Sequence, residues 1–302
     1  MMPEWPELKL MDAEDLPELR ECYLALMPET CDLSPASLFI WRDCEIPSLT
    51  RIHGQLCVML EPHLDPAYFL EPFGSGRIPE TMRACLSRTQ RISRVRQSVV
   101  AGLAPEEFDI RPLRDHYDYV YETRTLAELK GKGFDGKRNH IRRFARVCPG
   151  SEFRPLEPSQ FHHAAALFER WSELREVGYA GPQPPASYNN GCQRHAIERA
   201  FQDYERLGLF GGGLFVQGEM QGFIVGSDGA RDSAIAHFQY ANAELPGIYQ
   251  TLLWEACRHL FRHRPYINLE EDLGIPGLRK TKLSYRPFKL EEKYEIRLKS
   301  TA

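Results

Sequence analysis

The order of the elements expected in the second half of the chain restricts the fold more than any other feature of the sequence. Apolar residues at helical spacing predict two helices, alternating patterns around a tight Gly218–Glu219 turn predict three strands, and a further helix leads to a short apolar strand. These elements are expected at 161–171, 197–207, 213–217, 221–226, 234–240, 248–260 and 266–270. Because a strand that follows a crossover helix runs parallel to the strand before it, this order predicts an antiparallel meander that ends in a βαβ unit.

The first half of the chain is expected to be rich in strands, with helices between them. Its patterns predict a helix that begins near Asp12, strands within 49–61 and 67–73, a helix over 80–88 and a strand over 117–123. The pattern breaks at 148–151, and a chain of 302 residues suits two units of about 150 residues each. The sequence therefore predicts an α+β protein with mixed sheets in two domains, residues 1–148 and 149–302.

Composition and charge exclude several classes of protein. The apolar fraction of 42% suits ordinary cores, and a net charge of −4 argues against a protein that coats nucleic acid through its overall field. No window approaches about eighteen uninterrupted apolar residues, and the acidic start lacks the pattern of a secretory signal. The eight cysteines form no Cys-x-x-Cys pair and are expected to be buried thiols in a reducing compartment. These features predict a cytoplasmic globular protein.

Three consecutive carboxylates follow the strand that ends the crossover, and three cations follow a glycine-proline turn after them. The acids are Glu270, Glu271 and Asp272, and the cations are Arg279, Lys280 and Lys282 on a short helix before a last strand at 292–298. Ligands of open α/β sheets bind beyond the carboxyl ends of strands, so the segment suits a zwitterionic or phosphorylated ligand. A carboxylate such as Glu270 can also take the proton of an amine before the amine attacks an ester or thioester. Pairing of the acids with the cations of the same segment is the alternative.

A basic run occupies residues 130–146, where seven lysine and arginine residues accompany a single acid. As a helix, the run buries one apolar face and offers Arg138, Arg142 and Arg146 on another. Such a face suits phosphate, so Lys137, Arg138 and Arg142 are candidates for contact with the backbone of a tRNA or with the phosphates of a coenzyme A thioester. A solvated basic helix that pairs with nearby acids is the alternative.

One spacing in the sequence suggests a metal. Glu255, His259 and His263 are four residues apart on one helical face, which is a possible arrangement for ligands of a divalent ion. Arginines surround them on that polar face, so we interpret them as solvated residues and predict no metal site.

Three strings of the sequence resemble a known bacterial family. They are Tyr117-x-Tyr119, the Gly131–His140 segment with its Lys-Arg-Asn-His end, and the Asn268–Tyr285 segment with its Glu-Glu-Asp and Arg-Lys-x-Lys. The order of elements in the second half is likewise that of a GNAT-type N-acyltransferase. From about residue 30 onward, the chain resembles a family with tandem GNAT-like domains that is grouped with the C-terminal catalytic domain of phosphatidylglycerol lysyltransferases.

The resemblance implies two GNAT-like folds packed together and a chemistry related to aminoacyl-tRNA-dependent transfer, as in the lysyltransferases and the Fem-type peptidyltransferases. GNAT folds line their cleft with the strand that here contains His237 and Gln239, so both become candidates for contact with substrate. Tyr285 becomes a candidate proton donor for a leaving group. A structural histidine and a core phenol are the respective alternatives.

One departure from the GNAT pattern bears on the donor. GNAT enzymes that use acetyl-CoA hold its pyrophosphate in a glycine-rich turn at the start of the central helix. The corresponding segment, Ala243–Gln250, keeps only Gly247, and Glu244 would repel phosphate. This departure disfavours acetyl-CoA and favours either aminoacyl-tRNA as the donor or an altered donor site.

The sequence therefore predicts a transferase that moves an aminoacyl or acyl group to an amine or hydroxyl of a small-molecule, peptide or lipid-headgroup acceptor. We expect no transmembrane segment before the domains, in contrast to the membrane lysyltransferases, and this disfavours a lipid acceptor and leaves a soluble or peripheral acceptor open. Glu270 and Glu271 are expected to bind or deprotonate the incoming group, and the cations of the basic run and the short helix are expected to hold donor phosphates. An acyl-CoA-dependent N-acyltransferase and a non-catalytic binding module are the alternatives.

Overall fold

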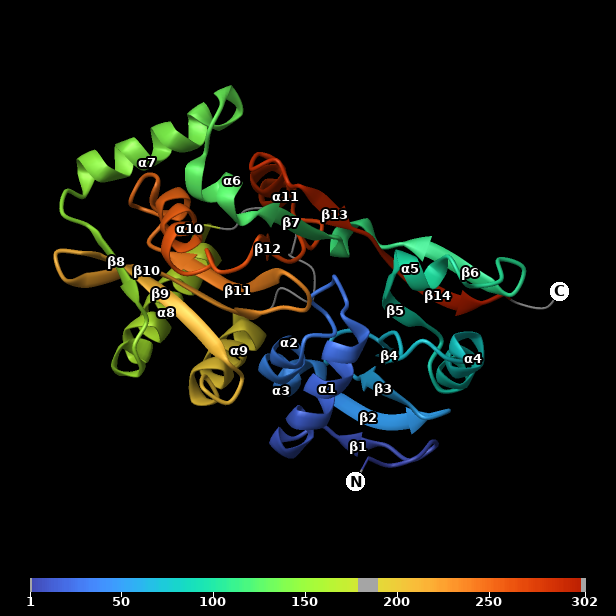
Figure 1. The fold of residues 1–302 in the computed structure, drawn as a ribbon. Coiled ribbons are helices and arrows are strands. Elements are labelled where there is room, and N and C mark those ends of the chain that lie inside the picture. Colours follow the sequence, from blue (N-terminus) through green and yellow to red (C-terminus); the bar gives the residue numbers. More distant parts are fainter. Residues whose placement is uncertain (1, 179–189, 300–302) are drawn as a thin grey trace.

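The strands of the computed structural model form two seven-stranded sheets within the described residues, 2–178 and 190–299 (Figure 1). Each sheet is mixed, because a parallel pair lies among antiparallel neighbours in both. Helices pack on the faces of the two sheets, which form the two lobes of the molecule. This architecture confirms the predicted α+β class with mixed sheets.

The first sheet is built from the N-terminal part of the chain and from the last strand. In spatial order its strands are β1 (Lys9–Leu10), β2 (Pro47–Ile52), β3 (Gln55–Leu60), β4 (Tyr68–Phe69), β5 (Ile92–Arg96), β14 (Lys293–Leu298) and β6 (Phe108–Pro112). The expected strand pattern over 49–61 is a hairpin of β2 and β3. Its turn lies at His53 and Gly54, whose positive φ values of 51° and 78° match a tight hairpin turn.

The second sheet contains the predicted meander and its parallel end. In spatial order its strands are β13 (Lys289–Glu291), β7 (Asp118–Glu122), β12 (Tyr266–Asn268), β11 (Ser233–Ala241), β10 (Glu219–Asp228), β9 (Leu209–Val216) and β8 (Glu152–Pro155). β9, β10 and β11 are antiparallel neighbours, and β12 pairs in parallel with β11 after the crossover helix. The predicted βαβ unit is thus confirmed.

The two lobes exchange strands. β7 comes from the first half of the chain but pairs with β12 and β13 in the second sheet. β14 is the last strand of the described residues and belongs to the predicted second unit by sequence, but it pairs with β5 and β6 in the first sheet. In Figure 1 the red ribbon of β13 and β14 runs from one lobe into the other. The boundary between residues 148 and 149 stays a prediction, and a strand of each half lies in the other half's sheet.

Helices surround both sheets. They are α1 (Leu16–Leu26), α2 (Pro35–Ile40), α3 (Arg42–Glu45), α4 (Ile78–Arg88), α5 (Gln97–Val100), α6 (Thr123–Glu128), α7 (Asp135–Val147), α8 (Phe161–Gly178), α9 (Asn190–Gln202), α10 (Ile248–His259) and α11 (Pro276–Leu283). α9 ends at Gln202, before the end of the predicted helix over 197–207, because the chain turns there toward β9. None of the helices in the described part of the chain is long and apolar enough to span a bilayer.

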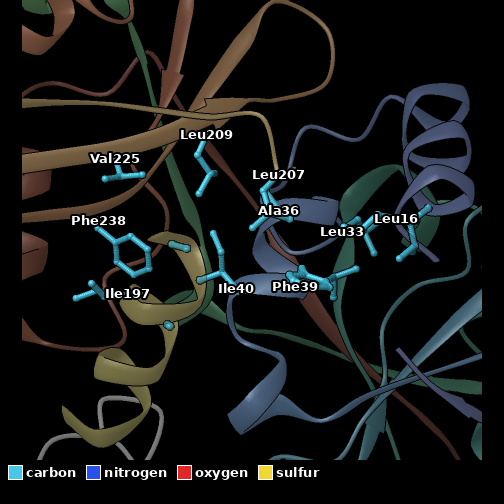
Figure 2. Close-up of a cluster of buried hydrophobic side chains, with 14 of the residues drawn as sticks. Leu16, Leu33, Ala36, Phe39, Ile40, Ile197, Leu207, Leu209, Val225 and Phe238 are labelled. Atoms are coloured by element: carbon cyan, nitrogen blue, oxygen red, sulfur yellow. The ribbon is translucent and has the colours of Figure 1, made fainter. Parts of the chain in front are cut away.

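One buried apolar cluster joins the lobes (Figure 2). Phe39 and Ile40 of α2 lie in it with Ile197 of α9 and Phe238 of β11, and all four side chains are almost fully buried. A second cluster packs α10 and α7 on the opposite face of the second sheet. The shared cluster holds α2 and α9 against each other. Both helices contribute walls to the space between the two sheets, so the cluster also fixes these walls.

A disulfide also joins the lobes, between Cys44 of α3 and Cys192 of α9, whose Cα atoms lie 5.8 Å apart. The expectation that all eight cysteines are thiols is therefore wrong for this pair. The two residues are 148 positions apart and belong to no motif, so only the folded chain brings them together. The other cysteines are free, and all of them except the half-buried Cys22 are buried as expected.

Candidate active site between the two sheets

A cavity of about 630 Å³ lies between the two lobes. Residues of both halves of the chain line it, from α2, β5, β11, α10, α11 and the turn after β12. Its apolar wall includes the aromatic residues Trp41, Trp171, Phe238, Tyr240 and Tyr249. Its polar wall includes Asp32, Arg94, His237, Glu270, Glu271 and Lys282. A site with a large apolar wall and a few converging charged groups is typical of a pocket for a small molecule or a reacting group.

The cavity opens where β11 and β12 separate. The two strands pair over only three positions, from Ser233 opposite Tyr266 to Ile235 opposite Asn268. β11 then continues to Ala241, whereas the chain after β12 turns away through Glu270, whose φ is +57°. The turn places the first two predicted acids on the cavity wall, at the carboxyl end of a parallel strand where ligands of such sheets bind.

His237 sits in a β-bulge on β11. Val225 of β10 pairs with Phe238 and the next residue, Gly226, pairs with Ala236, so His237 is the extra residue. The strict alternation expected for this strand is therefore wrong at His237. A bulge re-aims a side chain, and here the imidazole is buried with its Nδ1 3.0 Å from Glu270 Oε1. Its Nε2 lies 2.8 Å from Ser227 Oγ.

Glu270 is held in place from two sides. Its backbone N–H donates to Asn268 Oδ1 at 2.7 Å, and its carboxylate meets the imidazole of His237. Burial raises the pKa of Glu270, and the hydrogen bond with His237 offsets only part of that effect. A carboxylate with a raised pKa on a cavity wall is suited to accept a proton from a bound amine or hydroxyl.

Glu271 belongs to a buried cluster of charges. Its Oε2 lies 2.9 Å from His116 Nδ1 and 3.8 Å from Lys293 Nζ. Burial alone would raise the pKa of Glu271, but His116, Arg94 and Lys293 outweigh burial and hold it well below its ordinary value. Glu271 is therefore a fixed negative charge, which suits it to bind a cation rather than to move a proton.

Lys293 is the centre of the same cluster and has no exposed surface. Its Nζ lies 2.5 Å from Asp32 Oδ2 and 2.6 Å from Asp118 Oδ1. Asp118 also accepts from the Asn268 amide at 2.9 Å and from the Cys31 backbone N–H at 2.8 Å. Lys293 starts β14 and Asp118 starts β7, so this ion pair joins the two exchanged strands.

Arg94 enters the cavity wall through a second bulge. Between β5 and β14, Ile92 pairs with Ile296 but Val95 pairs with Tyr294, which leaves one extra residue on β5. Arg94 has a φ of +61° at this point, and its guanidinium lies 3.4 Å from Asp32 Oδ1. The bulge, which forms where β5 pairs with the exchanged strand β14, thus places the Arg94 cation on the cavity wall together with Glu270 and Glu271.

Asp272 is paired within its own segment, in contrast to Glu270 and Glu271. Its fully buried carboxylate accepts from Arg279 Nε at 2.8 Å, from Arg114 at 3.1 Å and from the Tyr119 hydroxyl at 2.5 Å. The two interpretations of the acidic segment, ligand binding and pairing with its own cations, thus apply to different residues. Two of its carboxylates face the cavity, and the third holds the following helix in place.

The three predicted cations of α11 separate in the same way. Lys282 lines the cavity, and its Nζ donates to the carbonyl oxygens of Leu269 at 2.6 Å and Glu271 at 2.5 Å. Arg279 is engaged by Asp272 and Asp115. Lys280 is exposed and lies outside the cavity lining. Of the three, only Lys282 is placed to meet a ligand in the cavity.

The basic helix α7 lies beside the cavity but does not line it. Arg138 donates to the carbonyl oxygens of Leu129 and Gly131 and pairs with Asp135, so it ties the start of α7 to the loop before it. Arg142 is exposed on the same helix. The structure therefore does not bring these two arginines together with the acids of the cavity.

Lys137 and Tyr285 link α7 to the cavity wall. Lys137 Nζ lies 3.6 Å from the centre of the Tyr285 ring and donates to Ser284 Oγ at 2.6 Å. Burial lowers the pKa of Lys137 to about 8. Tyr285 is buried, lines the cavity and stays a phenol at neutral pH because burial raises its pKa.

The start of α10, where GNAT enzymes bind pyrophosphate, is covered by α7. Gly247 has a φ of +88°, and a Cβ atom there would collide with the backbone carbonyl oxygen of His140 in α7. Protein backbone therefore packs directly against the first turn of α10. This contact agrees with the loss of the glycine-rich turn from the sequence.

The groups able to hold a metal differ from the one considered in the sequence. His259 pairs with Glu255, but His263 lies 2.7 Å from Asp228, so the three residues do not converge. Among the described residues, two groups have ligand atoms within 4.8 Å of one another: Cys31 with Asp32 and Asp118, and Cys44 with His63 and Cys192. Lys293 already supplies the positive charge of the first group.

Sequence reasoning missed Asp32, Arg94, His116, Asp118 and Lys293 as members of the site. One signal was present, because Asp118 and Lys293 are charged residues at buried positions of strands, where apolar side chains are usual. The contact between Asp118 and Lys293 depends on the exchange of β7 and β14 between the sheets, which no local sequence pattern predicts.

The comparisons with known proteins agree with this fold. The sequence profile of the family described as "Phosphatidylglycerol lysyltransferase, C-terminal" matches residues 25–297. A conserved protein of unknown function from Bacteroides thetaiotaomicron is similar in structure, with a TM-score of 0.87, 29% identity, and coverage of 99% of this chain and 100% of that one. No curated protein sequence matches the chain.

Two further solved structures show the same fold at lower identity. The C-terminal domain of a putative lysylphosphatidylglycerol synthetase from Agrobacterium fabrum has a TM-score of 0.64 at 14% identity, over 96% of this chain and 93% of that one. A tandem GNAT protein from the clavulanic acid biosynthesis pathway has a TM-score of 0.51 at 10% identity, over 98% and 99%. The fold is thus that of two tandem GNAT-like units, as predicted. The chain belongs to the family of the phosphatidylglycerol lysyltransferase C-terminal domain.

Proposed function

We propose that the protein transfers an aminoacyl group from aminoacyl-tRNA to an amine or hydroxyl acceptor inside the cavity between the sheets. The family and the fold are those of acyl and aminoacyl transferases. The observation that carries the proposal is the Glu270–His237 pair on the cavity wall, at the point where β11 and β12 separate. The contact between α7 and the start of α10 supports a donor other than coenzyme A.

The proposed reaction is a direct transfer. Glu270 takes the proton of the acceptor amine or hydroxyl, and the freed nucleophile attacks the carbonyl carbon of the aminoacyl ester. The ester bond to the 3′ oxygen of the tRNA breaks, a new amide or ester bond forms, and the leaving oxygen takes up a proton. Tyr285 is our candidate for the donor of this proton, because its phenol stays protonated and lines the same cavity.

Glu271 and Lys282 have binding roles in this proposal. Glu271 keeps its negative charge within the buried cluster and lines the cavity, so it is suited to hold the ammonium group of the aminoacyl moiety. The Lys282 ammonium donates to two carbonyl oxygens of the same backbone turn, lines the cavity and is suited to a carbonyl or carboxylate oxygen of a ligand. A zwitterionic group would meet both charges.

The exposed arginines of α7 are the proposed contacts of the tRNA backbone. Replacing Arg142 and Arg146 by glutamate is expected to weaken tRNA binding and to lower the slope of log affinity against log salt concentration by roughly 2, or about one per lost phosphate contact. Fluorescence anisotropy at several salt concentrations measures both. Arg88, exposed in the last turn of α4 in the other lobe, is the matched control, and Arg88→Glu should leave the slope unchanged. An unchanged slope in the double variant would argue against α7 as the tRNA surface.

A transfer assay tests the proposed function itself. The protein is incubated with tRNA charged with radiolabelled amino acids, or with labelled acetyl-CoA, and with amine, peptide and lipid-headgroup acceptors. We expect label in an acceptor from charged tRNA only, and we expect RNase treatment of the donor to abolish it. Transfer from acetyl-CoA alone would support the N-acyltransferase instead, and binding of charged tRNA without any transfer would support a binding module.

A further inference from the structure

A hollow on the outside of the molecule, separate from the cavity, gathers two sulfur and two imidazole side chains. It has a volume of about 450 Å³ and is lined by Cys44 of α3, His63 after β3, and Cys192 and His195 of α9. The ligand atoms of Cys44, His63 and Cys192 all lie within 4.8 Å of one another. We propose that, when Cys44 and Cys192 are reduced, these three residues bind a Zn²⁺ ion.

The local structure holds the ligands in place. The backbone N–H of His63 donates to the backbone carbonyl oxygen of Cys44 at 3.2 Å, so the loop after β3 is tied to α3. Cys192 and His195 are three residues apart on α9, a spacing that puts both side chains on one face of a helix. His195 lines the same hollow one turn from Cys192, but its ring nitrogens lie outside the group of atoms within 4.8 Å, so its side chain would have to turn toward the metal to supply a fourth ligand.

The chemistry of this set favours zinc. Cysteine and histidine are the usual ligands of tetrahedral zinc sites, and Cys44, Cys192 and His63 supply three of the four positions. Thiolate and imidazole ligands select zinc and copper over magnesium and calcium, which prefer oxygen ligands. The positive charge nearby is compensated, because Arg199 of the same hollow is paired with Asp43 at 3.0 Å.

The disulfide and the zinc site are alternative states of the same two sulfur atoms. A dithiol reductant passes two electrons and two protons to the Cys44–Cys192 bond, which gives two thiols, and the reductant becomes a cyclic disulfide. Zn²⁺ then displaces the two thiol protons and binds the two thiolates and the imidazole of His63. Reducing compartments keep protein thiols in this second state.

Either state clamps the same two helices beside the cavity. Gln193, next to Cys192, lines the cavity and accepts from the Tyr240 hydroxyl at 2.6 Å. Trp41, which also lines the cavity, directly precedes α3 with Cys44. The metal site would thus hold the wall of the cavity in place in a reducing compartment. The disulfide would do the same in an oxidising compartment. This role is independent of the reaction that takes place in the cavity.

Zinc titration of the full chain tests the site. The protein is reduced with a dithiol, freed of metal, separated from the reductant without oxygen, and titrated with Zn²⁺ against a colorimetric chelator. We expect one tight equivalent per chain in the reduced protein and none in the oxidised protein, a comparison that needs no substitution. Titration with Co²⁺ should give the thiolate-to-metal charge-transfer absorption of a tetrahedral sulfur site.

Variants assign the ligands. Cys44→Ser, Cys192→Ser and His63→Ala should each weaken zinc binding by more than the roughly 10- to 100-fold that loss of an outer-shell partner causes. Cys22→Ser and His162→Ala, at a free cysteine and an exposed histidine outside the hollow, should bind like the unchanged protein. The proposal would be overturned if the reduced protein bound zinc no more tightly than the Cys44→Ser/Cys192→Ser variant does. It would also be overturned if the oxidised protein bound zinc as tightly as the reduced protein.

Discussion

Replacing Glu270 by glutamine is expected to lower kcat for acyl transfer by a factor of about 100 or more, because a positioned general base typically contributes that much. Glutamine keeps the size of the side chain and a hydrogen bond to His237 but cannot accept the acceptor's proton. KM should change little, since Glu271 and Lys282 still line the cavity. Steady-state kinetics with the acceptor found in the transfer assay separate the two constants.

The pH dependence distinguishes a base from a merely structural residue. Burial raises the pKa of Glu270, so kcat of the unchanged protein should fall as the pH drops through that raised value and the carboxylate is protonated. The glutamine variant should lose this acid limb. Glu244, exposed before the first turn of α10, is the matched control, and Glu244→Gln should keep both kcat and its pH profile. A folded Glu270→Gln protein with an unchanged kcat would remove Glu270 as the base.

Replacing Lys293 by methionine is expected to destabilise the protein by about 3–5 kcal/mol, because loss of one partner leaves buried charges uncompensated. Asp32 and Asp118 both lie within 2.6 Å of the Lys293 ammonium, and neither carboxylate has appreciable contact with solvent. The substitution also weakens the junction of the exchanged strands β7 and β14. Urea unfolding followed by circular dichroism measures the difference in the free energy of unfolding.

The loss of stability in the Lys293→Met variant should depend on pH in a direction that the pKa shifts define. In the unchanged protein burial lowers the pKa of Lys293, but Asp118 and Asp32 outweigh it and hold the pKa well above its ordinary value. The contribution of the lysine is therefore fully present at neutral pH and is lost only as the pH rises through that value. In the variant, Asp32, whose pKa burial already raises, takes up a proton as the pH falls. The destabilisation should thus be smaller at pH 5 than at pH 8.

Lys289 provides the matched control for this experiment. It lies in β13, four residues before Lys293, but its side chain is exposed and pairs with Glu291 at the surface of the strand. Lys289→Met should change the free energy of unfolding by no more than about 0.5 kcal/mol, as is usual for surface substitutions. Equal effects of the two substitutions would show that the buried cluster does not hold the lobes together.

Local patterns predicted the elements of this fold well. The helix expected over 248–260 is α10, the strand expected over 234–240 lies within β11, and the short strand at 266 begins β12, because apolar periodicity reports burial directly. The same reasoning placed Glu270 and Glu271 at the end of a parallel strand, where the structure has them. The missing glycine-rich turn was also visible in the sequence, and the packing of α7 on α10 explains what fills its place.

Features that depend on distant segments could not be predicted from the sequence. Arg94 and His237 reach their positions through β-bulges, which shift the register by one residue and break the alternation that strand predictions assume. Lys293 meets Asp118 only because the last strand enters the first sheet. Cys44 and Cys192 meet because α3 and α9 pack together across the two lobes. In each case tertiary packing, not local pattern, sets the contact.

Photo-crosslinking with a charged tRNA tests whether the cavity between the sheets is the place of transfer. A tRNA carrying a benzophenone amino acid is bound to the protein and irradiated, and the adducts are mapped by mass spectrometry. Our proposal predicts adducts on cavity residues such as Trp41, Tyr249 and Leu278, which competition with uncharged tRNA reduces. Adducts confined to the outer surface of either lobe, with none on the cavity lining, would contradict it.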